Sequence, residues 1–149
     1  MDKPTEIAAA RIWVVLAKAY KAMAAFVERQ VAAQGLGLSD FMVLEVLLHR
    51  GPLTISAIGE KVLLANASMT SAIDRLEQKG YVVRKTSDED RRIRMVELTT
   101  NGSDFIQAIF ERHETAIEEL MSDMGQEERG AIYAGLKKIG LAAAAANEP

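Results

Sequence analysis

The sequence predicts a mainly α-helical protein with one small β-hairpin, and three observations support this prediction. Apolar residues recur at helical spacing through most of the 149 residues, a length typical of one domain. Two short runs, 81–84 and 93–98, have the composition of strands, and the second alternates apolar and polar side chains. Apolar residues make up 49% of the chain and charged residues 26%, which is the composition of a globular protein.

The first predicted helix covers residues 5–33, with Thr5 as its expected N-cap. Apolar residues lie on more than one face of it, and at 1.5 Å per residue it spans roughly 40 Å. A small domain does not need a helix of this length. We therefore expect a second subunit to cover part of it.

Three shorter helices are expected next. One begins at its N-cap Ser39 and stops before Gly51-Pro52. Residues 55–62 form the second, and the third ends near Lys79 after a turn at 64–66. Two short helices joined by a brief turn form a helix-turn-helix.

The second helix of this motif has two different faces. Its apolar residues follow the spacing of a core stripe: Met69, Ala72, Ile73 and Leu76. The opposite face is small and polar: Ala67, Ser68, Thr70, Ser71, Asp74, Arg75 and Gln78. Hydroxyl and amide groups at a helix start can hydrogen-bond base edges or phosphates. Gly80 follows at the position where a left-handed residue ends a helix.

The connection between the two predicted strands, residues 85–92, is longer than a tight turn and rich in charge. Beyond the second strand, Thr99 or Thr100 is expected to cap a helix that runs to about Met124. A last helix opens at 126–128, and the alanine-rich segment 142–149 is expected to fray.

Charge is distributed unevenly along the chain. The net charge is −3, but the stretch from Lys61 to Arg94 holds eight Lys or Arg and five Asp or Glu. That stretch carries +3, and the remainder carries −6. A basic segment on an acidic body fits a localised phosphate-binding face. A surface rich in salt bridges has the same composition, so charge alone leaves both interpretations open.

Several classes of function are excluded by what the sequence lacks. Without cysteine, it has no disulfide and no thiolate nucleophile. It shows no glycine-rich phosphate loop and no nucleophile elbow, and His49 and His113 lack the spacing of metal ligands, so we predict no enzyme, metal or cofactor. Because Arg11, Lys18 and Lys21 interrupt the apolar N-terminal run, it fails as a signal or membrane span, and a cytoplasmic location is expected.

The order of helix-turn-helix, two-stranded wing and long flanking helices resembles the MarR family of bacterial transcriptional regulators. The residues that carry this resemblance are Leu76-Glu77, Gly80-Tyr81-Val82, Arg84, Asp90-Arg91-Arg92, Val96-Glu97-Leu98-Thr99 and Gly102. The resemblance implies a single domain with a winged helix-turn-helix at about 36–99. It also implies a homodimer in which helices at about 5–33 and 101–145 form a dimerisation layer. The implied DNA target is a pseudo-palindromic operator, and many members release it when a small phenolic or anionic ligand binds between the two layers.

The residues expected to contact DNA, or to position those that do, lie on the second helix of the motif and on the wing: Asn66, Ser68, Thr70, Ser71, Arg75, Lys85, Asp90, Arg91 and Arg92. The helix residues are expected to face a major groove. The alternative is that Asn66 and Ser68 only cap the helix.

On the wing, the resemblance implies that Arg92 enters the minor groove and that Asp90 orients it. A carboxylate partner reduces the rotamer freedom that an arginine otherwise loses on binding. Arg91 and Lys85 are expected to meet phosphates, and Arg84 is expected to brace the base of the wing against Asp90. The alternative for Asp90 and Arg92 is an exposed ion pair of little energetic value.

We therefore predict a sequence-specific DNA-binding regulator that acts as a ligand-responsive repressor. A winged-helix module that binds proteins and no DNA is the alternative, although such interfaces need apolar anchors. Trp13, Tyr20 and His49 lie on helices that would flank the family's ligand cleft, where aromatic walls suit a small aromatic or anionic effector. Packing in a dimer core explains these side chains equally well.

Overall fold

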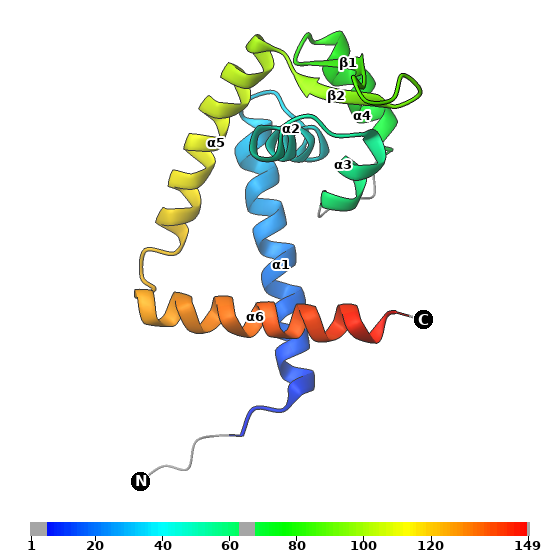
Figure 1. Ribbon diagram of the computed structural model, residues 1–149. Coiled ribbons are helices and arrows are strands. Elements are labelled where there is room, and N and C mark those ends of the chain that lie inside the picture. Colours follow the sequence, from blue (N-terminus) through cyan, green and yellow to red (C-terminus); the bar gives the residue numbers. More distant parts are fainter. Residues whose placement is uncertain (1–5, 63–67, 149) are drawn as a thin grey trace. The chain divides into compact units, whose positions relative to one another are not determined.

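The computed structural model describes residues 6–62 and 68–148, and the chain divides into two compact units, 1–113 and 114–149. The described elements are α1 (Ala9–Ala32), α2 (Leu38–Arg50), α3 (Ile55–Lys61), α4 (Met69–Gln78), β1 (Val82–Thr86), β2 (Arg94–Leu98), α5 (Thr100–Leu120) and α6 (Gln126–Ala146) (Figure 1). The prediction of a mainly α-helical fold with one small hairpin is confirmed. None of the described helices is long and apolar enough to cross a membrane.

The core of the first unit gathers side chains from α2, α3, α4, both strands and α5. The predicted core stripe of α4 is confirmed, because Ala72, Ile73 and Leu76 are fully buried and Met69 packs against them. Burial of one such large apolar side chain stabilises the fold by about 1.5–3 kcal/mol. This packing holds the apolar face of α4 inward, so its polar face is turned to solvent.

The two strands form an antiparallel ladder from Val82↔Leu98 to Thr86↔Arg94. Val82 and Val96 point into the core, and Leu53 adds an isolated bridge to Val96. We call β1, β2 and the connection between them the wing. Its base is therefore anchored in the same core as α4.

The junction between α4 and the wing is a tight left-handed turn at Gly80. Gly80 has φ of 77°, and the amides of Gly80 and Tyr81 donate to the carbonyls of Glu77 and Leu76 at 3.0 and 2.9 Å. These two bonds are the Schellman pattern that satisfies the last carbonyls of a helix. The predicted role of Gly80 is confirmed.

Two predicted helix starts need correction. The N-cap of α1 is Ala8 and makes no side-chain cap bond, while Thr5 lies outside the described residues. Ser39 is not a cap, because α2 already begins at Leu38 with Gly37 as its N-cap, and the carbonyl of Gly37 accepts from the amide of Phe41 at 2.9 Å. Packing of Leu38 against the core outweighs the capping preference of serine.

The second unit corrects the predicted ends of the last two helices. α5 ends at Leu120 rather than near Met124. Just after this end, the Arg129 side chain donates to the carbonyls of Met121 and Met124 at 2.7 and 3.0 Å. Segment 142–149 does not fray at residue 142, since α6 continues to Ala146. Alanine has the highest helix propensity of all residues, which explains the extension.

Candidate nucleic-acid interface

The N-terminal end of α4 presents small hydroxyl groups to solvent. Ser68 is its N-cap, with Oγ accepting from the backbone N–H of Ser71 at 3.4 Å. Ser68, Thr70 and Ser71 are all exposed. Asn66, which was expected to join them, lies outside the described residues. A helix end with exposed donors and little bulk can approach a groove closely.

Arg75, one turn further along α4, has a partner that the sequence analysis did not identify. Its Nη2 donates to Oδ1 of Asp40 at 2.7 Å and its Nε donates to Oδ2 at 3.3 Å. Asp40 is 3% exposed and lies in the first turn of α2, where the helix dipole favours a negative charge. The hydrogen bond with Asp40 raises the pKa of Arg75.

A signal for Asp40 was present in the sequence. Asp40, Leu44 and Leu47 follow the i, i+4, i+7 spacing, and all three are buried. A carboxylate at a core position of a helix needs a buried partner, because an unpaired buried charge is very costly. The spacing alone does not show which residue supplies that partner.

Arg84 is not paired with Asp90, which corrects the expectation for the base of the wing. Its Nη1 donates to Oε1 of Glu77 at 2.7 Å, and its Nη2 donates to Oδ1 of Asp74 at 2.6 Å. The hydrogen bond with Asp74 is the largest cause of the raised pKa of Arg84, followed by its interactions with Glu77. Arg84 therefore joins β1 to α4 and neutralises two acidic groups of that helix.

At the tip of the wing, Asp90 holds both the backbone and the side chain of Arg92. Asp90 Oδ1 accepts from the backbone N–H and Nε of Arg92 at 2.9 and 3.2 Å, and Oδ2 accepts from Nη2 at 3.3 Å. Donation from the backbone N–H of Arg92, and then from its side chain, lowers the pKa of Asp90. The Arg92 side chain is 91% exposed, so it is oriented and accessible at once.

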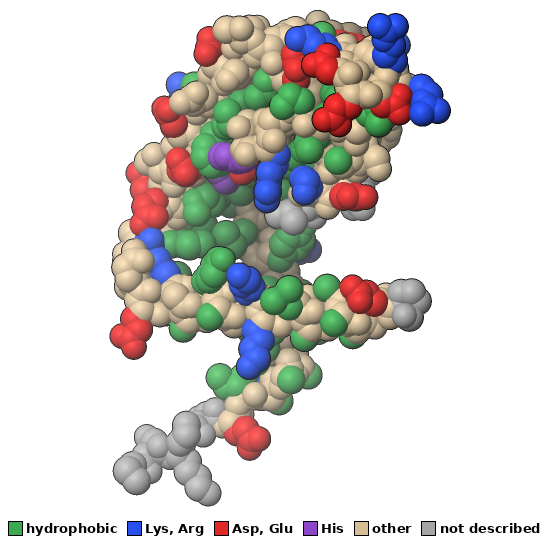
Figure 2. Space-filling model, viewed as in Figure 1, with side chains coloured by type: hydrophobic (Ala, Val, Ile, Leu, Met, Phe, Trp, Pro, Cys, Tyr) green, Lys and Arg blue, Asp and Glu red, His purple; other side chains and the backbone are tan. Residues whose placement is uncertain are grey.

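Three further basic residues surround this pair. Arg91 and Arg94 are exposed, and Lys85 of β1 forms an ion pair with Glu97 of β2. Basic and acidic side chains are interspersed around the wing in Figure 2. Some cations of the charged stretch are therefore paired within the protein, whereas Arg91 and Arg94 have no ion-pair partner among the described residues.

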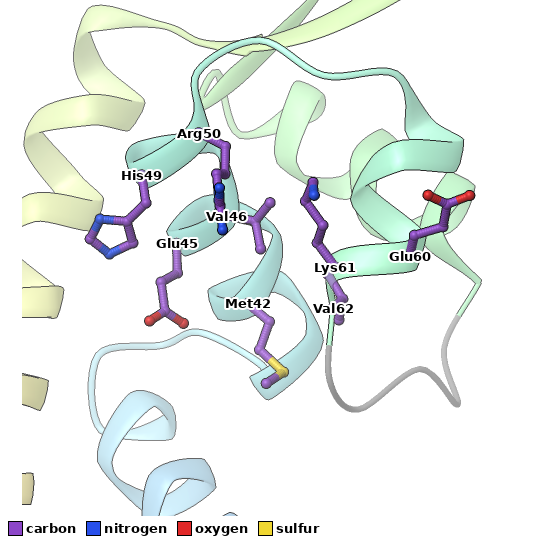
Figure 3. A pocket seen from close by; sticks show the side chains of 8 residues that line it. All are labelled: Met42, Glu45, Val46, His49, Arg50, Glu60, Lys61 and Val62. Carbon is purple, nitrogen blue, oxygen red and sulfur yellow. The ribbon is translucent and has the colours of Figure 1, made fainter. Parts of the chain in front are cut away.

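A pocket of about 490 Å³ lies between α2 and α3 (Figure 3). Its lining residues are Met42, Glu45, Val46, His49, Arg50, Glu60, Lys61 and Val62. Arg50 and Lys61 lie on either side of Val46, while the Glu60 carboxylate points away from them. Of the three aromatic residues considered for an effector site, His49 lines this pocket, whereas Trp13 and Tyr20 do not.

The two histidines pack against the same phenylalanine. The ring of His49 lies 4.6 Å from that of Phe110, and the ring of His113 lies 6.1 Å from it and 5.2 Å from Phe41, between ring centroids. Within 6–62 and 68–148, no group of three potential ligands is placed to hold a metal ion.

Comparisons with known proteins agree with this architecture. The MarR family model matches residues 36–93. HTH-type transcriptional regulator MhqR of Bacillus subtilis is 35% identical over 131 residues, which cover 88% of this chain and 90% of MhqR. BpsR of Bordetella bronchiseptica, whose DNA binding is regulated by 6-hydroxynicotinic acid, matches with a TM-score of 0.75 and 22% identity over 87% of this chain and 98% of its own. A mutant MarR from Escherichia coli complexed with operator DNA matches with a TM-score of 0.74 and 19% identity over 87% and 93%.

Proposed function

This chain belongs to the MarR family of DNA-binding transcriptional regulators, and we propose that it is a repressor that reads its operator with α4 and grips it with the wing. The observation that carries this proposal is the combination of an exposed, small-polar face on α4 and an oriented, highly exposed arginine at the wing tip. We also propose that the protein acts in the cytoplasm without catalytic activity, and that residues 1–149 belong to one functional domain.

The reading part comprises the exposed residues of α4. Ser68, Thr70 and Ser71 contact base edges or phosphates in the major groove, where each base pair presents a distinct pattern of donors and acceptors. Asn66 is assigned to the same contact from its place in the sequence. The Ser68 hydroxyl can cap the helix and bind DNA at the same time. It accepts one hydrogen bond within the described residues, so its O–H donor and its second lone pair remain available for DNA.

The gripping part is the wing. Arg92 enters a minor groove, whose narrow form attracts guanidinium groups. An arginine free in solution loses up to about 2 kcal/mol of rotamer entropy when it is immobilised, and its bonds to Asp90 reduce that loss. Arg91 and Lys85 contact phosphates, for which Lys85 exchanges its ion pair with Glu97.

A homodimer places two such surfaces on one operator. Large apolar side chains are exposed on the first half of α1, including Trp13 at 67%, and along α6, including Leu136 at 46%. Exposed apolar surface of this extent marks an interaction site in a soluble protein. We assign α1, α5 and α6, about residues 5–33 and 101–145, to the dimerisation layer and about 36–99 to DNA binding.

The decisive experiment compares two arginines of the wing. Fluorescence anisotropy measures binding to a labelled duplex from the DNA upstream of the protein's own gene, over a series of salt concentrations. Arg92→Ala is expected to weaken binding by roughly tenfold or more, since each good DNA contact contributes about 1–3 kcal/mol. Arg91→Ala removes the same charge without a carboxylate partner, and its smaller loss should fall mainly on the salt dependence.

Two outcomes would contradict this assignment. If the wild-type protein bound its upstream DNA no better than a shuffled duplex, the operator assignment would fail. If Arg92→Ala and Arg91→Ala lost equal affinity, Arg92 would be an ordinary phosphate contact. Circular dichroism of both variants confirms that the fold is retained.

We further propose that the pocket between α2 and α3 binds a small aromatic anion as effector. Its volume suits a small ligand, Met42, Val46 and Val62 provide an apolar wall, and Arg50 and Lys61 have no ion-pair partner among the described residues. A thermal-shift titration with benzoate is expected to raise the melting temperature of the wild type. The double variant Arg50→Gln/Lys61→Gln should lose this stabilisation, whereas Lys18→Gln/Lys21→Gln, with the same charge change on α1, should keep it. Equal stabilisation of both double variants would overturn the site.

A further inference from the structure

Asp40 is the one buried charged side chain among the described residues, and its partner lies on the helix that reads DNA. Both carboxylate oxygens of Asp40 accept hydrogen bonds from Arg75, across 35 positions of sequence. The Asp40 side chain is 5% exposed and that of Arg75 is 47% exposed. The pair therefore has a buried acidic end and a basic end that reaches the surface.

The surface end of Arg75 lies on the proposed DNA-binding face of α4. Ser68, Ser71 and Arg75 follow the spacing i, i+3, i+7, which places them in one stripe along the helix. A guanidinium carries five N–H groups. Asp40 takes one from Nε and one from Nη2, and the N–H groups that remain on Nη1 and Nη2 form a second edge with no acceptor among the described residues.

This arrangement fixes the direction in which the second edge of Arg75 points. A long side chain on a helix surface samples several rotamers, but a two-bond contact with a buried carboxylate selects one of them. The cost of burying Asp40 is reduced by its place in the first turn of α2 and by Arg75 itself. The charges of Asp40 and Arg75 largely cancel. The pair therefore orients Arg75 for DNA binding more than it adds electrostatic attraction to the phosphates.

We propose that Asp40 is a positioning residue for sequence recognition, which holds Arg75 so that its free edge meets the operator. This inference rests on the proposed function, because it needs α4 to lie in a DNA groove. It assigns to α2, a helix that does not touch DNA in this scheme, a direct influence on which sequence is bound. A bond that only joins α2 to α4 would affect stability without changing sequence preference.

The test uses full-length protein and two duplexes of equal length, the upstream operator and a shuffled sequence, with anisotropy as readout. Asp40→Asn is expected to weaken operator binding by roughly tenfold and to reduce the ratio between operator and shuffled affinities. This direction is informative because removal of a negative charge by itself strengthens DNA binding. Glu28→Gln on α1 is the matched control for charge, and it should bind the operator at least as tightly as the wild type.

A double-mutant cycle shows whether Asp40 acts through Arg75. In an Arg75→Ala background, Asp40→Asn should cause no further loss of operator affinity. Arg75→Lys keeps the charge but not the two-edged fork, so it should retain affinity for the shuffled duplex and lose preference for the operator. If thermal melting shows that Asp40→Asn does not fold, Arg75→Lys alone is used to test the inference.

Three results would overturn the inference. One is unchanged preference in both Asp40→Asn and Arg75→Lys. Another is a loss from Asp40→Asn that is equally large in the Arg75→Ala background, which would assign the effect to the fold. In both of these cases the wild type still prefers its operator, so the proposed function stands. If the wild type itself shows no preference for the operator, the proposed function fails and the inference fails with it.

Discussion

Arg84 donates from Nη1 to Oε1 of Glu77 at 2.7 Å, and this contact joins the wing to the reading helix. The backbone N–H of Arg84 donates to the other oxygen of Glu77 at 3.3 Å, and Nη2 reaches Asp74. The Arg84 side chain, which is 18% exposed, thus adds to the core packing and the turn at Gly80 that already connect helix and wing. A rigid connection of this kind would keep the proposed major-groove and minor-groove contacts at a constant separation.

Arg84→Gln is expected to weaken operator binding more than Lys79→Gln, which removes from the C-cap of α4 a charge with no ion-pair partner among the described residues. The reason is that Asp74 and Glu77 then face DNA without a cation. The free energy of unfolding should fall by only about 1 kcal/mol, because both carboxylates are substantially exposed. Anisotropy and urea unfolding measure the two effects. Equal loss of affinity in the two variants would show that the ion pair has no role in binding.

Gly102→Ala is expected to destabilise the protein by about 1–3 kcal/mol or more, because a methyl group there meets backbone. An ideal Cβ at Gly102 lies 1.9 Å from the carbonyl oxygen of Tyr81. Gly59→Ala is the matched control, since an ideal Cβ there lies 3.4 Å from Cγ of the flexible Met69 side chain. Thermal melting of the two variants decides the matter. A melting temperature of Gly102→Ala equal to that of Gly59→Ala would mean that α5 approaches Tyr81 less closely than described.

The carboxyl of Asp90 is expected to titrate below the pKa of an ordinary aspartate. A depressed pKa means that the contact with Arg92 stabilises the folded wing above the pKa of the unfolded chain, and that this contribution disappears as pH falls through the folded pKa. Carbon-detected NMR measures this pKa, with the urea-unfolded protein as reference. Arg92→Ala should raise it only partly, because the backbone N–H of residue 92 still donates. Identical folded and unfolded values would exclude the contact in solution.

Leu136→Asp is expected to convert the proposed dimer to monomer. Ile132, Leu136 and Ile139 form one apolar stripe on α6, and none of them is buried within the chain. Lys138→Asp is the control on the same helix, with a larger change of charge at a polar position. Light scattering coupled to size exclusion gives the mass of each variant. A dimeric Leu136→Asp variant, or a monomeric wild type, would move the subunit interface elsewhere.

Local sequence determined the parts of the protein that depend on neighbours a few residues away. The core stripe of α4 follows from apolar spacing, and the turn at Gly80 follows from the conformational freedom of glycine. Of the two residues expected to cap α5, Thr99 is the one that does so, with Oγ1 accepting from the amide of Gly102 at 3.0 Å. The contact between Asp90 and Arg92 spans two residues, and a short-range pattern of this kind is readable before any fold is known.

Only the tertiary structure decided which distant residues meet. Arg84 binds Glu77 and Asp74 because the turn at Gly80 folds β1 back along α4, whereas sequence distance alone made Asp90 an equally reasonable partner. Arg129 ends α5 by reaching back across the corner to two carbonyls, an interaction that helix propensity does not describe.

The same distinction applies to the proposed DNA-binding face of α4. The sequence by itself determined that α4 has a small, polar face with an arginine about two turns from its start. The packing of α2 against α4 decided the direction of this arginine, Arg75. That packing places the buried Asp40 carboxylate where it accepts two hydrogen bonds from the guanidinium. The physical reason is that periodicity sets which face of a helix is buried, while an ion pair requires two atoms within about 3 Å, and the fold alone brings distant atoms to that separation.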